Sequence, residues 1–209
     1  MSSRGETSRS AIVLTGGRSS RMGRQKAALR FGESTLLERT IAELGKFFDD
    51  IVIVAAPDAA EAPLTIPRNA RIIRDDREYQ GPALALARGL EATRAATAFA
   101  CSCDLPMLDA RVAAALLAML SGYDAVIPSV ADRLQPLHAA YRREVGGALR
   151  AMLARGENRL SAIAQAVTTR QVGETELRAL DPELLSFLNV NTPADYARAL
   201  RLTATTSRR

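Results

Sequence analysis

Short apolar runs rich in Val and Ile alternate with amphipathic stretches along most of this chain, and this alternation constrains its fold more than any other feature. Such runs are typical of strands buried in a sheet, whereas Leu and Ala at helical spacing predict helices that cover it. The sequence therefore predicts an α/β fold, a single Rossmann-like three-layer domain with a mostly parallel central sheet. Strands are expected at 11–15, 51–55, 70–74, 97–103 and 124–130, and helices at 35–44, 82–92 and 111–120.

The pattern becomes less regular after residue 130. A further strand is expected at 135–143 and helices at 145–155, 159–166 and 193–202, the last with Asn191 or Thr192 as its N-cap and Pro193 as its first residue. With 209 residues, 47% of them hydrophobic, the chain can bury the core of one full domain. We place this domain at 11–202, between loose polar tails at 1–10 and 203–209.

Composition excludes several classes of partner. No apolar stretch approaches the ~18 residues that cross a bilayer, and the polar first ten residues do not resemble a secretory signal, so we expect a cytoplasmic protein with no membrane partner. Cys101 and Cys103 are expected to be buried small apolar residues. The net charge of +5 comes from scattered arginines and aromatic residues make up only 4%, so we expect no nucleic-acid partner. An anionic small-molecule substrate fits this charge equally well.

A loop rich in glycine and basic residues follows the first expected strand directly. Gly16, Gly17 and Gly23 let backbone N–H groups approach an anion, and Arg21 and Lys26 add positive charge, so the loop is suited to a polyphosphate. The spacing of the glycines matches neither a P-loop nor a dinucleotide-binding fingerprint. Of the 28 basic residues, all but two are arginines. A lysine at position 26, beside the glycines, therefore suggests a role for which a compact cation is better suited than a guanidinium. The alternative is an ordinary solvated loop.

Carboxylates follow two other expected strands, at the edge where open α/β sheets bind ligands. Asp104 comes directly after the strand at 97–103, and a carboxylate beside a polyphosphate loop is a natural Mg²⁺ ligand. The alternative for Asp104 is to cap the next helix, for which Asp109 is the better candidate, or simply to end the strand in a turn. Asp75 and Asp76 follow the strand at 70–74, and one of them could face the nucleotide.

Three polar residues near the end of the chain also need an interpretation. The sole histidine, His138, is a candidate general base, but a lone histidine near a strand is more often structural, and attack by a phosphate needs no base. Asn189 and Asn191 share one face of an extended segment because they are two residues apart, so both could bind a ligand rich in heteroatoms. Capping of the last helix is the alternative for Asn191.

Together these residues resemble the molybdenum cofactor guanylyltransferase family of nucleotidyltransferases. The similarity covers the glycine loop from Leu14 to Lys26, the Gly-Pro pair at 81–82, the Cys-Asp-Leu-Pro sequence at 103–106, and the Phe-Leu-Asn-Val-Asn-Thr-Pro sequence at 187–193. Many sugar and polyol nucleotidyltransferases share the first motif, whereas its combination with the last is much narrower.

The resemblance implies transfer of GMP from GTP to molybdenum-molybdopterin, with release of pyrophosphate. Arg21, Lys26 and Asp104 would be catalytic, with Arg21 and Lys26 holding phosphates and Asp104 binding Mg²⁺ as cofactor. Asn189 and Asn191 would lie toward the molybdopterin. The nucleotide-binding residues would be Leu14, Thr15, Gly16, Gly17, Lys26, Asp75 and Asp104.

Three alternatives stay open at this point. A cytidylyltransferase acting on the same pterin is the nearest, because Val54 and Ala55 stand where an Asn can contact the base, although the adjacent glycines favour guanine. The others are a nucleotidyltransferase for a sugar or polyol phosphate, and a catalytically silent nucleotide-binding or cofactor-delivery protein. Molybdoenzyme apoproteins or cofactor chaperones are further partners that the resemblance implies.

Overall fold

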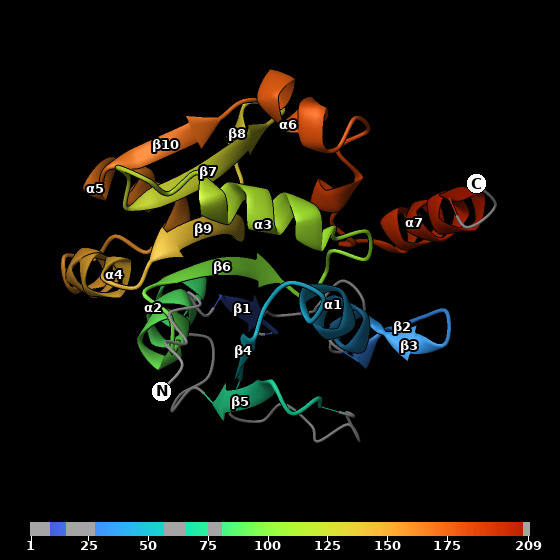
Figure 1. Cartoon of the computed structure of the whole chain (residues 1–209), viewed down its shortest axis with the longest axis horizontal. Helices are drawn as coiled ribbons and strands as arrows, with labels where there is room; N and C mark the ends of the chain where they lie inside the picture. The colour runs from blue at the N-terminus through green and yellow to red at the C-terminus, as the bar shows by residue number, and fades with distance from the viewer. Residues whose placement is uncertain (1–8, 16–27, 57–65, 75–80, 207–209) are drawn as a thin grey trace, which may run out of the picture.

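The computed structural model describes residues 9–15, 28–56, 66–74 and 81–206, and within them an eight-stranded sheet forms the centre of the molecule (Figure 1). The strand order is β10-β7-β9-β6-β1-β4-β5, and β8 pairs with β7. Neighbouring strands run parallel except that β9 is antiparallel to β6 and β7, and β8 is antiparallel to β7. The strands are β1 (Ser10–Leu14), β4 (Asp50–Ala55), β5 (Ala70–Arg74), β6 (Thr97–Ser102), β7 (Ala125–Val130), β8 (Arg133–Leu134), β9 (His138–Arg142) and β10 (Thr169–Val172).

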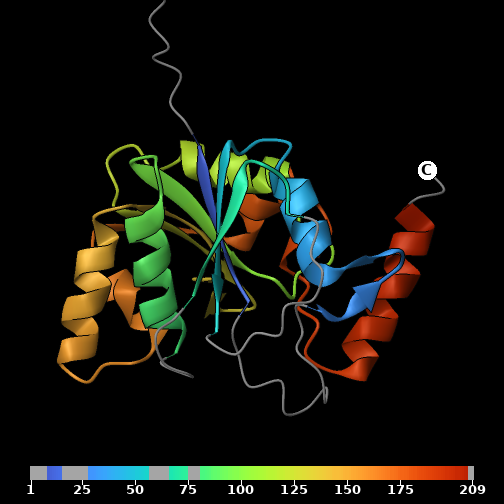
Figure 2. The same cartoon turned by 90° about the horizontal axis from the view of Figure 1, so that it is seen from below.

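Helices cover both faces of this sheet, which confirms the predicted three-layer α/β fold (Figure 2). One face carries α2 (Pro82–Ala92), α4 (Val145–Ala154) and α5 (Ile163–Ala166). The other carries α1 (Leu36–Leu44), α3 (Ala110–Ala118) and α6 (Glu174–Leu180). None of the helices in the described ranges is both long and apolar enough to span a membrane.

The alternation of side chains along the central strands divides the core into two layers. In β1, Ala11 and Val13 pack toward α1 and α3, whereas Ile12 and Leu14 pack toward α2 and α4. All five residues of β1 are buried, as expected for a parallel strand covered on both faces. Gly89 lets α2 approach closely, because a Cβ at this position would lie 2.6 Å from Cγ2 of Ile12.

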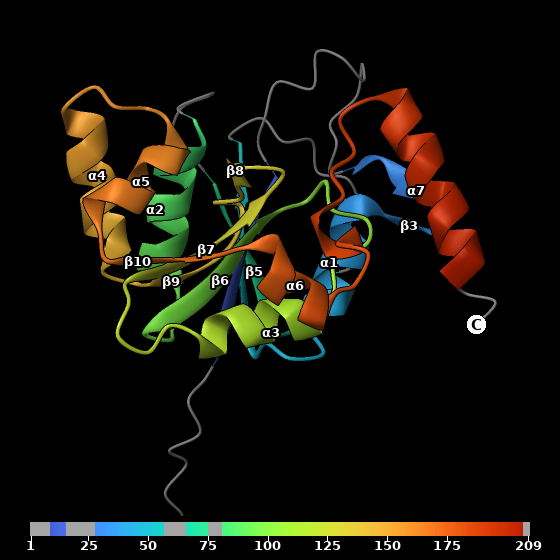
Figure 3. The ribbon, with the colours of Figure 1, turned by 90° about the horizontal axis from the view of Figure 1, so that it is seen from above.

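A small satellite cluster lies beside this core, between a β-hairpin and the last helix. The hairpin is formed by β2 (Arg30–Phe31) and β3 (Ser34–Thr35), and α7 (Pro193–Thr206) packs against it (Figure 3). Phe31, Leu36, Val190 and Ala199 are its buried members. The rings of Phe31 and Tyr196 meet edge to face at 5.8 Å. This contact joins an early segment of the chain to its C-terminal part.

Most predicted elements of the first 130 residues are confirmed, and larger departures follow residue 130. The strand expected at 135–143 begins only at His138, and the chain forms β10 and α6 where no element was predicted. Of the residues in these two elements, only Val172 and Leu177 are buried, so neither presents the apolar pattern that sequence reasoning detects. The hairpin and β8 were also missed because strands of two residues carry no periodicity.

The end of the last helix also differs from the prediction. α7 continues to Thr206, so the loose tail expected from Thr203 begins inside a helix. No Gly or Pro lies between Thr203 and Thr206 to stop the helix. Thr203 Oγ1 also donates to the carbonyl of Ala199 at 3.0 Å and contacts Met107 Sδ at 3.1 Å, which ties this turn to the body of the domain.

Candidate functional site

The carboxyl end of β1 lies between two neighbouring strand ends. Thr15 donates its backbone N–H and its Oγ1 to the carbonyl of Val54 at the end of β4, at 3.0 and 3.2 Å. On the other side, the N–H of Cys103 donates to the carbonyl of Leu14 at 3.1 Å. Leu14 and Thr15, two of the predicted nucleotide-binding residues, thus lie directly beside the turn that carries Asp104.

Other predicted site residues fall outside the described ranges. These include the loop residues that were expected to cradle the phosphates and both acidic residues after β5. Their predicted roles stay predictions. They are Gly16, Gly17, Arg21, Lys26, Asp75 and Asp76.

Asp104 directly follows the turn residue Cys103 after β6, and the residue is partly exposed at this edge. Ser102 Oγ donates a hydrogen bond to Asp104 Oδ1 at 2.5 Å. The alternative role as a helix cap is wrong, because α3 is capped by Asp109, whose Oδ1 accepts from the N–H of Arg111 at 2.8 Å. Asp104 lies in the turn that ends β6, and its role as a metal ligand stays a prediction.

The segment that carries Asn189 and Asn191 docks directly on Asp104. The N–H of Val190 donates to the backbone carbonyl of Asp104 at 2.9 Å. Val190 is buried in the satellite cluster, whereas Asn189 is partly exposed and Asn191 is exposed. Asn189 and Asn191 flank this buried valine in the chain, and their predicted role in binding a ligand stays a prediction. Two parts of the chain 85 positions apart, Asp104 and Asn189, thereby meet at one edge of the sheet.

The cap of α7 is Thr192 and not Asn191. Thr192 Oγ1 accepts from the N–H of Asp195 at 3.2 Å, and Asp195 Oδ2 accepts from the N–H of Thr192 at 2.9 Å. The same Asp195 oxygen accepts the backbone N–H of Asn191 at 3.1 Å. This reciprocal pattern is a capping box and orders the backbone of the segment. Capping therefore does not account for the Asn191 side chain.

His138 is a buried structural residue, so its assignment as a general base is excluded. Its side chain packs edge to face on Phe99 at 5.1 Å between ring centroids and against Phe187 at 4.2 Å. Burial lowers the pKa of His138 to about 3, so the imidazole is a weak base, and with 2% of the residue exposed it lies out of reach of a substrate. Its Nε2 lies 3.4 Å from Ser186 Oγ, on the short helical turn Leu185–Phe187 that precedes Asn189. The histidine thus supports the candidate site from beneath.

Comparison with known proteins identifies the family. The family model of the MobA-like NTP transferase domain matches residues 11–172. A protein named probable molybdenum cofactor guanylyltransferase from Methanosarcina mazei is 34% identical over 197 residues, covering 90% of this chain and 88% of the relative. The chain belongs to this nucleotidyltransferase family. The MobA-like family model ends at Val172, so the segment with both asparagines lies beyond it, although the similarity to the curated relative covers most of the chain.

Solved structures show that the fold is shared more widely than any one substrate. Molybdopterin-guanine dinucleotide biosynthesis protein A from Archaeoglobus fulgidus superposes with a TM-score of 0.81 at 24% identity, covering 94% of this chain and 99% of the other. The 2-C-methyl-D-erythritol 4-phosphate cytidylyltransferase from Thermus thermophilus superposes with a TM-score of 0.69 at 20% identity, covering 92% and 97%. Likenesses at these identities establish the nucleotidyltransferase fold and leave the choice of base to the site itself.

The side chains at this edge bear on whether a metal ion can bind here together with a phosphate. Within the described ranges, no group of three or more His, Cys, Asp or Glu side chains could form a closed metal cage. Cys101 and Cys103 are buried free thiols, as expected, and burial raises the pKa of Cys101, which keeps it protonated. Mg²⁺ is satisfied by one or two carboxylates together with phosphate oxygens and water. Asp104 is a carboxylate of the kind that this coordination uses, and its role as a Mg²⁺ ligand stays a prediction.

Two further features of the site escaped or extended the sequence reasoning. Gly81 precedes α2 with φ of +86°, a backbone angle that favours glycine, and Pro82 begins the helix as predicted. Arg39 was not singled out, yet its Nε donates to the carbonyl of Pro106 at 2.6 Å, two residues after Asp104. The only signal in the sequence is an arginine early in a helix that follows the loop, which is too common to be informative.

Proposed function

We propose that this protein is a molybdenum cofactor guanylyltransferase, which transfers GMP from GTP to molybdenum-molybdopterin. One observation carries the proposal within the family: the hydrogen bond from Val190 N–H to the Asp104 carbonyl, which docks the Asn-Val-Asn segment on the turn that carries Asp104. Together with the backbone contact between Cys103 and Leu14, it brings the end of the first strand, the Asp104 turn and the Asn-Val-Asn segment to one edge, which supports the proposal. A donor nucleotide and a polar acceptor can meet there.

The reaction is a substitution at the α-phosphorus of GTP. An oxygen of the terminal phosphate of molybdopterin forms a bond to this phosphorus, while the bond from the α-phosphorus to the bridging oxygen breaks and pyrophosphate leaves with that electron pair. An anionic phosphate oxygen needs no general base, in agreement with a neutral, buried His138. The enzyme accelerates this step by orienting the two phosphates and by offsetting their charge.

Asp104 is proposed to hold Mg²⁺, which when bound offsets the negative charge that develops on the phosphates. Leu14 and Thr15 are proposed to begin the nucleotide cradle, and Asn189 and Asn191 to hydrogen-bond the pterin. The remaining cradle residues are proposed from the sequence alone. They are Gly16, Gly17, Arg21, Lys26 and Asp75.

We place this reaction in the cytoplasm, where GTP is made, and the two free thiols are compatible with a reducing compartment. The dinucleotide product is proposed to pass to molybdoenzyme apoproteins or to chaperones that carry the cofactor. A cytidylyltransferase on the same pterin is the second candidate, because Val54, which contacts Thr15, offers no side-chain amide to the base.

A substrate panel tests the proposal. The protein is incubated with Mg²⁺, one of GTP, CTP, ATP or UTP, and either molybdenum-molybdopterin or a sugar or polyol phosphate, and the pyrophosphate and dinucleotide formed are measured. We expect rapid turnover only with GTP and molybdenum-molybdopterin. A preference for CTP would establish the cytidylyltransferase. Turnover of a sugar or polyol phosphate would show that this phosphate is the acceptor, and GTP binding without pyrophosphate release would indicate a silent binding protein.

A further inference from the structure

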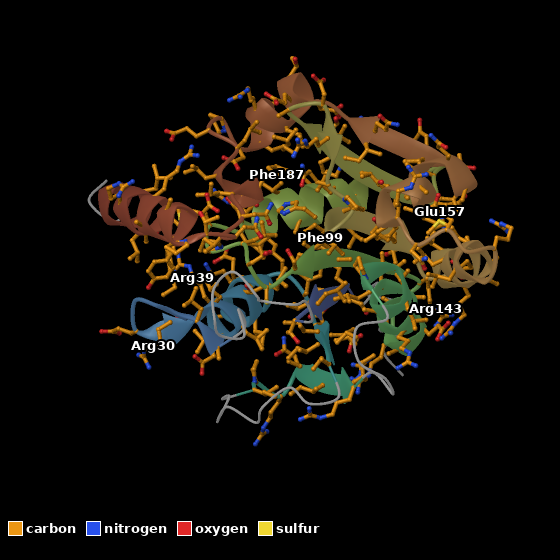
Figure 4. The ribbon with its side chains drawn as sticks, turned by 180° about the vertical axis from the view of Figure 1, so that it is seen from behind. Arg30, Arg39, Phe99, Arg143, Glu157 and Phe187 are labelled. Atoms are coloured by element: carbon orange, nitrogen blue, oxygen red, sulfur yellow. The ribbon has the colours of Figure 1, made fainter. Side chains whose placement is uncertain are left out.

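Arg39 is a partly buried cation that connects the Asp104 turn to another part of the molecule. It lies in the second turn of α1, where its Nε donates to the carbonyl of Pro106 at 2.6 Å. Its guanidinium carbon lies 5.4 Å from the centre of the Phe31 ring. Within the described ranges, no carboxylate forms an ion pair with it. Figure 4 places Arg39 between α7 and the β2–β3 hairpin.

These contacts link the residues on the two sides of Asp104 to one another. Starting at Asp104, its carbonyl accepts from Val190, and Val190 packs in the satellite cluster with Phe31. The guanidinium of Arg39 lies over the Phe31 ring, and Arg39 Nε donates to the carbonyl of Pro106, two residues after Asp104. The turn that carries the carboxylate is therefore held on both sides, by the acceptor segment and by α1.

The chemistry of arginine suits both contacts at once. A guanidinium is planar, so its edge can donate to a carbonyl while its face lies on an aromatic ring. A lysine ammonium is a compact charge on a flexible chain, and it cannot make both contacts with the same fixed geometry. The position of Arg39 thus depends on the shape of the side chain as well as on its charge.

We propose that Arg39 is a positioning residue, which fixes the Asp104 turn relative to the segment with Asn189 and Asn191. It acts through Asp104 and the Pro106 carbonyl and does not itself touch the reacting atoms. Partners behind a metal ligand commonly change metal affinity when they are removed, because the ligand loses its preferred orientation. This inference rests on the proposed function, since it takes Asp104 to be the metal ligand.

The test compares Arg39→Met and Arg39→Lys with the unmodified protein. Mn²⁺ bound to the protein with GTP is measured by electron paramagnetic resonance, and GTP binding without metal by calorimetry. In Arg39→Met we expect Mn²⁺ affinity to fall about tenfold. The KM for the pterin should rise and GTP affinity without metal should stay within about twofold. Arg39→Lys should be nearly as defective, because the lysine keeps the charge but lacks the planar guanidinium that makes both contacts.

Arg30→Met is the matched control. Arg30 lies in the β2–β3 hairpin and donates from Nη2 to the carbonyl of Glu33, also at 2.6 Å, but it is exposed and its side-chain hydrogen bond stays within the hairpin. We expect its metal affinity and its KM for the pterin to equal those of the unmodified protein. A loss as large as that of Arg39→Met would overturn the inference, because any arginine removed from this region would then have the same effect.

Further outcomes separate the inference from the proposed function. If Asp104→Asn leaves Mn²⁺ binding unchanged, Asp104 is not the metal ligand and the proposed function fails at that point. If Asp104→Asn abolishes binding and Arg39→Met does not weaken it, the inference alone is wrong. Full recovery in Arg39→Lys would overturn it as well, as would a defect in Arg39→Met that disappears when the variant is kept well below its melting temperature.

Discussion

The two edges of the central sheet each hold an aspartate at a strand end, and the two are used differently. At the amino edge, Asp50 is 1% exposed and its carboxylate accepts from Ser10 Oγ at 2.7 Å, from the N–H of Arg94 at 3.0 Å, and from the Arg71 guanidinium. At the carboxyl edge, Asp104 accepts from Ser102 and stays partly exposed. The fully buried Asp50 carboxylate with several internal hydrogen bonds stabilises the fold, whereas the partly exposed Asp104 is the one for which we propose a ligand.

The electrostatics of Asp50 show how completely it belongs to the fold. Burial alone would raise the pKa of Asp50, but the hydrogen bonds from Arg71, Arg94 and Ser10 and the charge of Arg71 bring it below its usual value of 3.8. A lowered pKa means that the ionised carboxylate stabilises the folded state above pH 3.8, and that this stabilisation is lost as the pH falls through the lower folded value. Asp50 is thus a structural charge.

The largest effect is expected at the carboxyl edge, from Asp104→Asn. This change keeps the shape of the side chain and removes the charge that Mg²⁺ requires, so pyrophosphate release should fall about a thousandfold, equivalent to about 4 kcal/mol in the barrier. Initial rates with saturating GTP and molybdenum-molybdopterin measure the loss. The melting temperature should shift by less than about 2 °C. A variant that retains a tenth of the activity would contradict the comparison.

The converse is expected from Asp50→Asn at the amino edge. The amide cannot replace the charge that faces Arg71, and we expect the free energy of unfolding to fall by about 2 kcal/mol, below the range for fully buried pairs because the Arg71 side chain is 31% exposed. Urea denaturation at pH 7.5 measures this loss. Turnover well below the melting temperature should match that of the unmodified protein, and a specific loss of turnover would show that the two edges are not separate.

His138 extends the comparison to a group buried beneath the site. Its pKa is lowered from 6.5 to about 3 by burial, so the unfolded chain binds a proton that the folded protein does not between these values. Stability is therefore fully present above pH 6.5 and should fall by up to about 1.4 kcal/mol for each pH unit below it. His138→Phe should flatten the decline measured by urea denaturation between pH 7.5 and 5. An equally steep decline in the variant would assign it to other groups.

The smallest effect is expected at an exposed pair with good geometry, Glu91 and Arg150. Two nitrogens of Arg150 reach the two oxygens of Glu91 at 2.5 and 2.6 Å, but both side chains are nearly half exposed. Solvent screens such pairs, so Glu91→Gln should change the free energy of unfolding by less than about 0.5 kcal/mol. Urea denaturation beside Asp50→Asn gives the comparison. A loss as large as that of Asp50→Asn would show that burial is not what separates them.

The sequence predicted most of the fold because its strongest signals are local. The apolar runs of β1, β4, β6 and β7 lie within a residue or two of the predicted strands, and Asp109 caps α3 as expected. The antiparallel pairing of β9 and the existence of the edge strand β10 could not be predicted in this way. The pairing of both strands depends on which distant segment they meet. β10 also has a single buried residue, so its sequence lacks the apolar pattern that predicts a strand.

The candidate site divides along the same line. Asp104 and Asn189 could be nominated because each belongs to a motif visible in the sequence. Arg39 could not, because its hydrogen-bond partner Pro106 lies 67 positions away in the chain. The role of His138 was also settled by its surroundings, since a histidine between two phenylalanine rings has a different pKa from one in water.

By itself the amino-acid sequence determined the layered α/β architecture, the position of the glycine loop after the first strand, and the residue types available for phosphate and metal binding. These follow from periodicity and from the chemistry of single side chains. Only the tertiary structure decided that Val190 docks on Asp104, that Arg39 supports this turn, and that His138 is neutral. Each of these depends on contacts between segments far apart in the chain, whose energies arise from burial that no short stretch of sequence contains.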